Sequence, residues 1–546
     1  MVLNLGLFDN RIQPHTSSEN PPKVSESDAK DQESRIQSVV TRVNSEESQN
    51  EDESSSTKYI PRLFDVWALG MTTVLGGTYY GWNEGLKAGF GSYLVGQVLM
   101  GISYVVLVCA LAEIVSTTSF SGGAYGMARV MLGFYPGFMM AAFEVTEYLT
   151  YPAASFSFIS GFICTEMGLN NSFEPLIILA CYLFSAIFLL TDNRLFWSLN
   201  ALLGLFSVAG ILFYCFGSLP YTNFIENASL HLHPNSSDPR NWFHGGIRSF
   251  LVLLPFTTWG FGGIESAALV TDLISNPRKN LSWGITYAGI TLFVLMIFTL
   301  FVAVSLPPGM KDTKMWKNQF FMDYGYEKMG FTAQNSQWVL LIPQFAMAFG
   351  FLLPAAKLFE AMACSKLLPS FLHAENTRNV TIYTLILSFV LSMCAIYIPS
   401  FDITNIPILF AMITYWSDLF AYYKLNSDFS TMDRLYHSPF GLVGTIFAGI
   451  IFLLCIIALI AFQSTFFILY FLIGFTMVLT LYYFFYAKSR QIFSEEEQKT
   501  LLSLHVMTLN KNKRRKTRSA GLFFFKSKSK SAPASVSKRS KSAALN

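Results

Sequence analysis

Charge is scarce in this sequence. Only 13% of its 546 residues are Asp, Glu, Lys or Arg, whereas soluble globular domains carry about 25%. Much of this charge lies at the two ends: residues 1–57 hold 11 acidic and 5 basic side chains, and residues 487–546 hold 3 acidic and 15 basic ones. The long section between them is too apolar for an ordinary water-soluble enzyme, and its hydrophobic content also excludes a disordered chain.

Signatures of metal, redox and cofactor sites are missing as well. The seven cysteines stand singly without a Cys-x-x-Cys pair, and an odd number argues against a disulfide framework. The histidines all fall outside the predicted membrane spans, so no nucleophile–base or metal set supports a membrane-embedded enzyme. We therefore predict neither an enzyme nor a cofactor, and no nucleic-acid partner. Residues 1–60 lack the apolar run of a cleavable signal peptide, so the first span should direct insertion.

Long apolar runs follow one another from Asp65 onward. A bilayer core requires about 20 helical residues, and the runs lack the alternation of a β-barrel strand. We expect an all-α membrane protein with about twelve transmembrane helices, because backbone polar groups in lipid must pair within their own segment. The predicted spans are residues 66–86, 92–115, 134–163, 174–191, 195–219, 247–270, 283–306, 336–360, 380–400, 403–423, 439–462 and 465–486.

Lys and Arg near the span ends are more numerous on the side that includes the N-terminus, which predicts two cytoplasmic termini. The sequons at Asn170, Asn227 and Asn235 then face outward and are candidate glycosylation sites. They favour the secretory route and the plasma membrane, with an internal membrane as the alternative. A transporter domain over residues 58–487 would thus carry two cytoplasmic tails.

The two tails have opposite character. Residues 1–57 are acidic and rich in Ser, and we expect them to be disordered. Residues 488–546 are basic and would contact the anionic lipids of the cytoplasmic leaflet. A solvated tail that serves solubility and topology is the alternative for this second segment.

Two spans are interrupted by glycine at matching places. Residues 72–82 contain a Thr pair followed by a Gly pair, and residues 255–265 repeat this order. The match suggests two repeats, at about 66–219 and 247–423, with two added helices within 439–486. Broken helices at corresponding points of two halves are the best sequence indication of a transporter's substrate site. The alternative is close helix packing through small residues.

Unwinding a membrane helix creates a binding site from the backbone itself. It frees N–H and carbonyl groups, and the half-helix ends carry opposite partial charges, so one substrate can place a carboxylate and an ammonium there. Trp259 could also cover an organic cation with its π face. The candidate substrate-binding residues in the two interrupted runs are Gly76, Gly77, Thr78, Tyr79, Phe256, Trp259, Gly260 and Gly262.

Three glutamates fall inside or beside the predicted spans. Glu144 and Glu147 are three residues apart and therefore share one helix face, and Glu265 directly follows the second interruption. An ionisable group in the membrane is costly unless it is paired or solvated, so each is a functional candidate. Such carboxyls suit proton coupling or contact with a substrate ammonium; the alternative is a structural carboxyl bonded to freed backbone amides.

Several motifs together resemble the amino acid–polyamine–organocation (APC) superfamily. The run Trp259-Gly-Phe-Gly-Gly-Ile-Glu265-Ser266 is similar to its sixth-helix motif, and Ser121-Gly-Gly-Ala-Tyr125 to the stretch between helices two and three. The run Glu144-Val-Thr-Glu147-Tyr148 is similar to the ethanolamine-permease-like branch. The resemblance covers residues 58–487. It implies a five-plus-five inverted repeat with broken helices 1 and 6, two extra helices, and alternating access.

The resemblance also implies roles for single residues. Gly76, Gly77 and Thr78 would take the substrate's polar head, and Trp259 would be an aromatic lid. Glu265 would couple the sixth helix to the gate, and Glu147 would meet the amine. The chain departs from the superfamily pattern at Gly76-Gly77-Thr78, where Gly-Ser-Gly is usual, and at Ser119, where Pro is frequent. Both departures leave the substrate open.

The sequence therefore predicts a secondary transporter for a small amine or amino acid. The related fold places cation-binding hydroxyls on the eighth span, but residues 343–357 contain neither Ser nor Thr. A proton is therefore the preferred coupling ion, and simple exchange is the alternative. A non-transporting nutrient sensor and a carrier for polyamine or choline-like cations are the competing functions.

Overall fold

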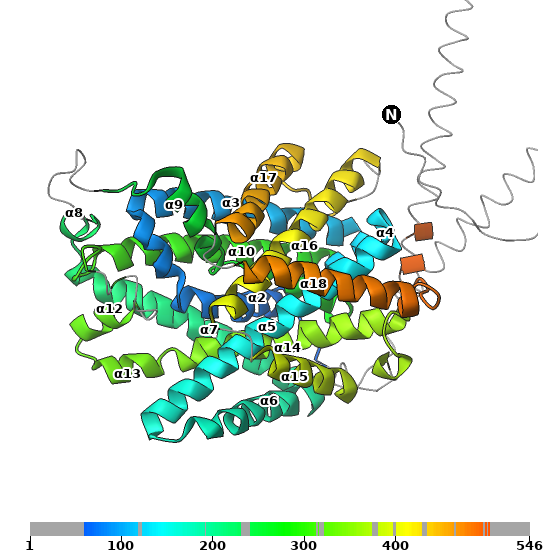
Figure 1. The fold of residues 1–546 in the computed structure, drawn as a ribbon, viewed down its shortest axis with the longest axis horizontal. Helices are drawn as coiled ribbons and strands as arrows, with labels where there is room; N and C mark the ends of the chain where they lie inside the picture. The colour runs from blue at the N-terminus through cyan, green and yellow to red at the C-terminus, as the bar shows by residue number, and fades with distance from the viewer. Residues whose placement is uncertain are drawn as a thin grey trace, which may run out of the picture. The chain divides into compact units, whose positions relative to one another are not determined.

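The structure is a computed structural model that describes residues 59–117, 123–191, 193–230, 241–312, 315, 321–373, 381–396, 400–428, 434–462, 466–494, 497–498 and 501–502. The expected tail at 1–57, most of the basic tail, Ser119 and Asn235 lie outside these residues. Within them the chain forms helices and loops and no strand. Figure 1 shows the helices with the labels used below.

The helices of the first half precede the loop at 231–240. In the labels, α marks α-helices and η marks 3₁₀ segments, except that η7 is a π-helix. They are α2 (Leu63–Tyr79), η1 (Trp82–Ala88), α3 (Phe90–Thr117), α4 (Gly123–Leu132), α5 (Phe134–Met167), η2 (Asn171–Phe173), α6 (Glu174–Thr191), α7 (Asn193–Ser218), η3 (Leu219–Tyr221) and α8 (Phe224–Asn227).

The helices of the second half begin after that loop. They are α9 (Gly246–Leu253), η4 (Leu254–Thr258), η5 (Ile264–Leu273), α10 (Pro277–Ser305), α12 (Asp323–Lys328), α13 (Ala333–Trp338), α14 (Leu341–Cys364), η6 (Ser370–His373), α15 (Ile382–Ala395), α16 (Ser400–Asp428), α17 (Gly441–Ala461), α18 (Phe467–Tyr482) and η7 (Tyr483–Ala487).

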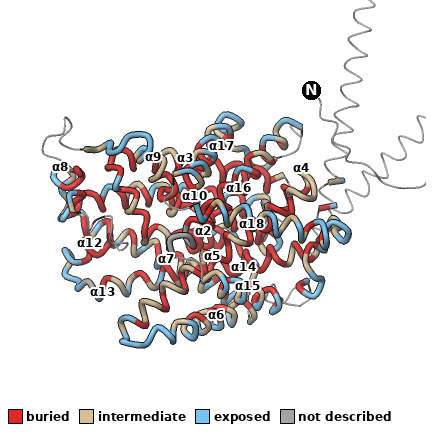
Figure 2. The backbone as a smooth tube through the Cα atoms, viewed as in Figure 1, coloured by how far each residue is buried: buried red, intermediate tan, exposed pale blue. Residues whose placement is uncertain are grey.

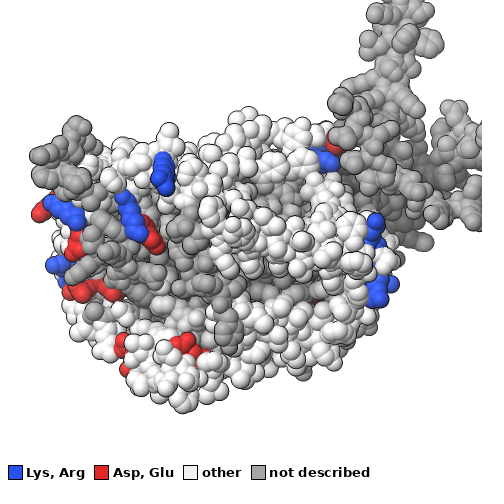
Figure 3. Space-filling model, in the orientation of Figure 1, with Lys and Arg blue, Asp and Glu red and all other residues white. Residues whose placement is uncertain are grey.

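The prediction of an all-α, multi-pass membrane protein is confirmed. Seven described helices are long and apolar enough to cross a bilayer, and Gly246–Thr258 and Ile382–Ala395 are shorter apolar segments. Helices α2, α5 and α16 occupy three further predicted spans. On the face shown in Figure 3, charged side chains lie mainly toward the two ends, and a broad band between them is uncharged. Such a band suits contact with lipid tails.

The most buried helices surround α2. It packs against α7, α10 and α14, while α5 packs against α14 and α16. Figure 2 shows buried backbone concentrated in this central group, with more exposed residues on α6 at the lower edge of the view. Helix α18 is also largely exposed. A helix surrounded by protein needs no lipid-facing stripe, because apolar side chains on every face are covered. The first broken helix, α2, thus lies in the interior.

The first broken helix ends one turn later than its glycine pair suggests. Helix α2 runs through Gly76 and Gly77 to Tyr79, and the chain leaves it at Tyr80, which is extended (φ −141°, ψ 129°). Gly81 then takes a left-handed conformation at φ 82°, which a glycine adopts without strain. The glycine pair therefore serves a close approach inside the helix, and the break itself lies at Tyr80 and Gly81.

The sixth predicted span is interrupted where expected. Helix α9 continues into η4, which ends at Thr258, and η5 starts at Ile264 after a turn. Gly263 closes this turn at φ 95°. The two halves of this span, α9–η4 and η5, therefore meet at residues 259–263. A short amphipathic helix, α4, was not among the predicted spans; it connects α3 to α5 and packs against α5 and α16.

Candidate functional site

The two broken helices touch at a glycine. A Cβ atom added to Gly77 would lie 2.1 Å from the carbonyl oxygen of Trp259 and 3.0 Å from its carbonyl carbon. The Trp259 ring in turn occupies the space beside Gly81, where an added Cβ would lie 2.5 Å from a ring atom. Only residues without a side chain allow the two backbones to come this close. The interruption of the sixth span is thus seated directly on α2.

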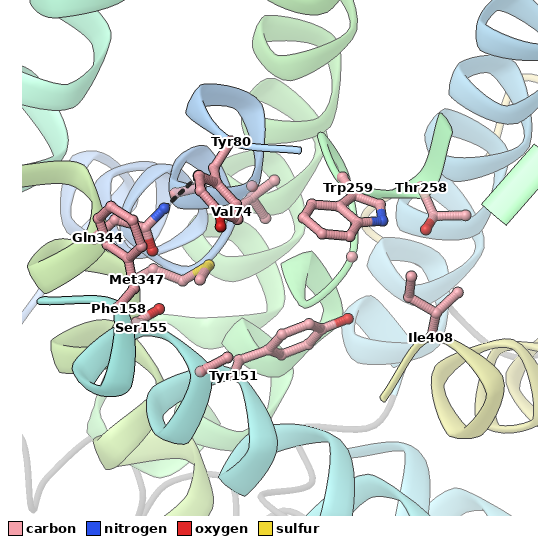
Figure 4. Close-up of a pocket in the computed structure, with 14 residues that line it drawn as sticks. Val74, Tyr80, Tyr151, Ser155, Phe158, Thr258, Trp259, Gln344, Met347 and Ile408 are labelled. Atoms are coloured by element: carbon pink, nitrogen blue, oxygen red, sulfur yellow. Dashed lines mark hydrogen bonds between the residues drawn. The ribbon is translucent and has the colours of Figure 1, made fainter. Parts of the chain in front are cut away.

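A cavity with a volume of about 80 Å³ opens beside this contact. Its wall combines five parts of the chain: α2, α5, the sixth-span interruption, α14 and α16. Figure 4 shows the labelled side chains converging from these elements. The described lining residues are Val74, Gly76, Gly77, Tyr80, Tyr151, Ala154, Ser155, Phe158, Thr258, Trp259, Gly262, Gln344, Met347 and Ile408. A cavity of this size can hold a few water molecules or one small group of a ligand.

Aromatic rings form one side of the cavity. The ring centroids of Tyr80 and Phe158 are 5.1 Å apart, and those of Tyr80 and Trp259 are 6.4 Å apart with the planes at 29°. Phe256 stacks behind Trp259 at 6.4 Å. Tyr151 stacks on Phe351 at 4.9 Å. The faces of such rings attract a cationic group.

The polar atoms of the wall are few and neutral. Gln344 Nε2 donates to the Gly76 carbonyl oxygen at 3.1 Å, which satisfies a carbonyl of the last α2 turn. Ser155 Oγ and Trp259 Nε1 are buried and have no hydrogen-bond partner in the described part of the chain. None of the described residues lining the cavity is Lys, Arg, His, Asp or Glu. A charged group of a ligand in the cavity would therefore interact with the dipoles of the wall and the π faces of its rings, and not with a charged side chain of the wall.

A group of carboxyls and tyrosines lies next to the cavity, and we call it the acid cluster: Glu144, Glu147, Glu265, Tyr148 and Tyr415. The Tyr148 hydroxyl lies 3.1 Å from Glu144 Oε1 and 3.2 Å from Glu265 Oε1, so it connects α5 with η5. The Tyr415 hydroxyl donates to Glu147 Oε1 at 3.2 Å and accepts from the backbone N–H of Gly263 at 3.1 Å. All five side chains are buried.

The acid cluster has no basic neighbour among the ion pairs of the described residues. The second carboxyl oxygens of Glu144, Glu147 and Glu265 are buried and accept no hydrogen bond from a described group. Asp418 on α16 adds a fourth carboxyl, which interacts electrostatically with Glu144 and Glu265. Buried carboxyls without a countercharge are costly unless a proton or another cation joins them.

Helix α5 connects the acid cluster to the cavity. Glu147, Tyr151 and Ser155 are spaced four residues apart along α5, so they lie along one face of the helix. Tyr151 and Ser155 line the cavity, whereas Glu147 lies nearer to the α4 end of the helix. The rise of about 1.5 Å per residue separates Glu147 from Ser155 by about 12 Å along the axis. The cluster is thus adjacent to the cavity and does not form its wall.

Comparison with known proteins identifies this architecture. The family model described as amino acid permease matches residues 62–485, which is most of the chain. The chain belongs to the amino acid permease family, within the APC superfamily. Over 257 residues it is 28% identical to an uncharacterized transporter of Rhizobium meliloti (strain 1021), in an alignment that covers 44% of this chain and 52% of that protein. The permease thus spans about half the length of this relative.

Four of the predicted substrate-binding residues line the cavity of the permease: Gly76, Gly77, Trp259 and Gly262. The other five, Thr78, Tyr79, Glu147, Phe256 and Gly260, are not among the described lining residues.

Each of these five has a different environment. The Tyr79 hydroxyl donates to the Ser207 carbonyl on α7 at 2.5 Å. Gly260 faces Met296 on α10. The Thr78 carbonyl accepts from Trp82 Nε1. Phe256 stacks on Trp259, and Glu147 belongs to the acid cluster.

Sequence reasoning missed several wall and cluster residues. Ser155 and Tyr151 continue the helix face of Glu147, so the i, i+4 spacing could have found them. Gln344 and Asp418 are polar residues inside predicted apolar spans, which is a signal in itself. Tyr415 could not be found this way, because tyrosine is common in this chain.

The predicted glycosylation sites differ in accessibility. Asn170 is exposed, and its side-chain oxygen accepts from Ser172. Asn227 is buried, and its Nδ2 donates to the Ser305 carbonyl at 2.9 Å. A glycan on Asn227 would remove this side chain from its pocket, since the same nitrogen carries the sugar. Asn235 lies outside the described residues.

Proposed function

We propose that this permease is a secondary transporter that carries a small amine or amino acid by alternating access. The observation that supports this most directly is the cavity at the contact between two broken helices, flanked by carboxyls that lack a basic partner. A small ligand in the cavity would contact α2, α5 and the sixth-span interruption together. Movement of either half of a broken helix would then open one side.

The wall favours a positively charged group on the substrate. The cavity lies beside the C-terminal part of α2, and this end of a helix carries partial negative charge. The rings of Tyr80, Phe158 and Trp259 add π faces. An ammonium group would therefore bind between the Gly76 carbonyl region and these rings, in keeping with an amino acid or an ethanolamine-like amine.

The acid cluster supports proton coupling. A proton shared by Glu147 and Glu265 would offset the cost of two buried carboxyls near Tyr415, and its release would change how Gly263 is held. Because Gly263 closes the interruption of the sixth span, protonation would be coupled to the geometry of the cavity. Exchange of one substrate for another without a net proton is the alternative.

The decisive experiment is uptake by the purified permease in proteoliposomes, with amino acids, ethanolamine, choline and polyamines as competitors. Trp259→Leu removes a ring from the cavity and should lower uptake by about tenfold, the value of a desolvated cation–π contact. Trp416→Leu is the matched control, because Trp416 is 46% exposed on the outside of α16. Equal uptake by both variants would refute the assigned cavity. Binding without accumulation would indicate a non-transporting sensor.

The coupling ion is tested in the same vesicles. Glu147→Gln should abolish uptake driven by a pH gradient, because the amide cannot take up and release the proton. Glu166→Gln is the matched control: Glu166 is a glutamate at the far end of the same helix, where it accepts a hydrogen bond from Gln334. Undiminished uptake in Glu147→Gln would reject this role. Uptake that requires sodium and ignores the pH gradient would reject proton coupling.

We further propose that both termini are cytoplasmic, in a plasma-membrane protein. The excess of Lys and Arg at the α4 end supports this orientation. The basic residues 488–546 would then face anionic lipids. Protease protection of epitope tags at the two ends tests the orientation, and fluorescence microscopy tests the membrane. Tags that are digested from outside intact cells would contradict the proposal.

A further inference from the structure

After η7, the last helical segment named above, the chain packs against the helix bundle again. Residues 491–494 and 497–498, which follow η7, are described, and we call them the C-terminal strap. Figure 1 shows α4 and the end of α18 at the same end of the bundle. The strap contacts Arg129, which lies on α4 and is buried. A fully buried arginine outside the transmembrane spans requires dedicated partners.

The strap supplies most of these partners. Arg129 Nη1 lies 3.0 Å from Glu497 Oε1, and Nη2 donates to the Ile492 carbonyl at 2.9 Å. The Phe493 ring lies 5.5 Å from the guanidinium carbon. From α4 itself, the Tyr125 hydroxyl accepts from Nη1 at 2.7 Å. Both side chains of the ion pair are almost fully buried, at 0% and 1% exposure.

The strap also holds the end of α14. Ser365, the residue after that helix, donates from Oγ to Glu497 Oε2 at 3.3 Å, and its carbonyl accepts from the Ile492 N–H at 3.2 Å. Within the strap, the Ser494 N–H donates to Glu497 Oε2 at 2.6 Å and the Glu497 N–H donates to Ser494 Oγ at 3.2 Å. This reciprocal pair fixes the position of the carboxylate. One glutamate therefore connects α4 with α14.

The two helices that the strap connects both contact η5, the inner half of the sixth span. A Cβ atom on Gly123, the first residue of α4, would lie 2.8 Å from a methyl carbon of Leu269. On the other side, Lys357 of α14 forms an ion pair with Asp272 of η5 at 2.7 Å. The strap, α4, η5 and α14 thus form a closed ring of contacts. Within this ring, η5 is the element that would have to move to open the cavity toward this side.

We propose that the C-terminal strap is a built-in regulatory clamp, which holds the cytoplasmic side closed while Glu497 is docked on Arg129 and allows η5 to move when it undocks. This inference rests on the proposed transport function and specifies its regulation. A buried ion pair suits a reversible clamp, because the cost of desolvating both charges offsets much of their attraction. An apolar anchor of equal area would hold more firmly and would respond less to a change of charge.

The clamp is tested in the full-length permease with Glu497→Ala and the milder Glu497→Gln. Hydrogen exchange of a peptide that covers residues 491–498 reports docking. A thiol at Leu269→Cys reports exposure of η5 to an impermeant maleimide added from the strap side, with the exposed Cys394 and the half-buried Cys181 and Cys364 replaced by serine. Loss of a buried charge-assisted contact should speed both reactions by about tenfold in Glu497→Ala and by less in Glu497→Gln.

The matched control is Glu113→Gln. Glu113 is a buried carboxylate that pairs with Arg434 without contacting the strap, so neither readout should change beyond about twofold, the scatter expected between independent sites. Faster exchange of the strap with unchanged labelling of Leu269→Cys would overturn the proposal, because the strap would then be an anchor only. Unchanged exchange would overturn it as well. Neither readout requires transport, so absence of uptake with both responses present would refute the proposed function and leave the strap's control of η5 standing.

Discussion

Replacement of Gly77 by alanine tests the contact between the two broken helices most directly. The added methyl carbon would lie 2.1 Å from the Trp259 carbonyl oxygen, well inside the closest approach of nonbonded atoms. The backbone alone fixes the position of the Cβ atom, and the Trp259 carbonyl is part of the backbone. No side-chain rotation can therefore relieve the overlap. The helices must separate by about 1 Å, and overpacking of this kind costs about 1–3 kcal/mol.

The net effect of Gly77→Ala includes a gain. Alanine favours a helix over glycine by about 1 kcal/mol, so a penalty at the upper end of the overpacking range leaves a net loss of about 2 kcal/mol. The apparent unfolding temperature in detergent should therefore fall by a few degrees. Uptake should fall more steeply, because the displaced carbonyl belongs to Trp259 in the cavity wall.

Gly161→Ala provides the matched control. Gly161 also lies within a helix, α5, but an added Cβ would meet no atom within 4 Å. Only the gain in helix propensity remains, so this variant should unfold at the same temperature as the parent or slightly higher. Thermal unfolding measured by size-exclusion profiles of detergent-solubilised protein compares the two variants. If Gly77→Ala proved as stable and active as Gly161→Ala, the two broken helices could not be in contact at this position.

Three further perturbations address the acid cluster, the cavity wall and the surface. Tyr148→Phe removes the hydroxyl between two carboxyls and should shift the pH profile of uptake in proteoliposomes while the protein remains folded, because each lost hydrogen bond to a charged group is worth about 1.5–3 kcal/mol; an unchanged profile would contradict the bridge. Gln344→Ala removes the hydrogen bond that holds the Gly76 carbonyl at the end of α2, and the loosened wall should raise KM for uptake by about tenfold; an unaltered KM would show that this hydrogen bond does not position the cavity wall. A glycan should be found by mass spectrometry on Asn170 and not on Asn227, because only the former side chain is exposed; occupancy of Asn227 would contradict its bond to Ser305.

The membrane architecture could be predicted from the sequence because lipid imposes a single local rule. A run of about 20 apolar residues must be helical, whatever its neighbours are. The helix α10, Pro277–Ser305, matches its predicted span of 283–306 for this reason. The helix α4 was missed because its ten residues are amphipathic and too short for the rule to apply.

Residues of the site could be predicted only where burying that residue type in a membrane is energetically costly in itself. Glu144, Glu147 and Glu265 could be named as functional candidates, because a carboxyl in a membrane span is costly unless it is paired or solvated; that α5 and η5 bring them together could not be read from the sequence. The position of the α2 break was displaced, because Gly76 and Gly77 permit both an interruption and a close contact, and only the three-dimensional partner, the Trp259 carbonyl, decides between them. Tyr415 gave no signal, since its role depends on a neighbour that is distant in sequence.

The separation of the cavity from the acid cluster has a consequence for coupling. The described cavity wall has no charged side chain, so a substrate ammonium and a proton need not compete for one carboxylate. Under the proposed function they would instead act on the same element from two sides: the substrate would touch Trp259 and Gly262, and the carboxyl of Glu147 would act on Gly263 through Tyr415. A ligand can shift a conformational equilibrium only by its difference in affinity for the two states. The cavity and the acid cluster both contact the interruption of the sixth span. A difference in affinity at one of these sites would therefore reach the other through this element.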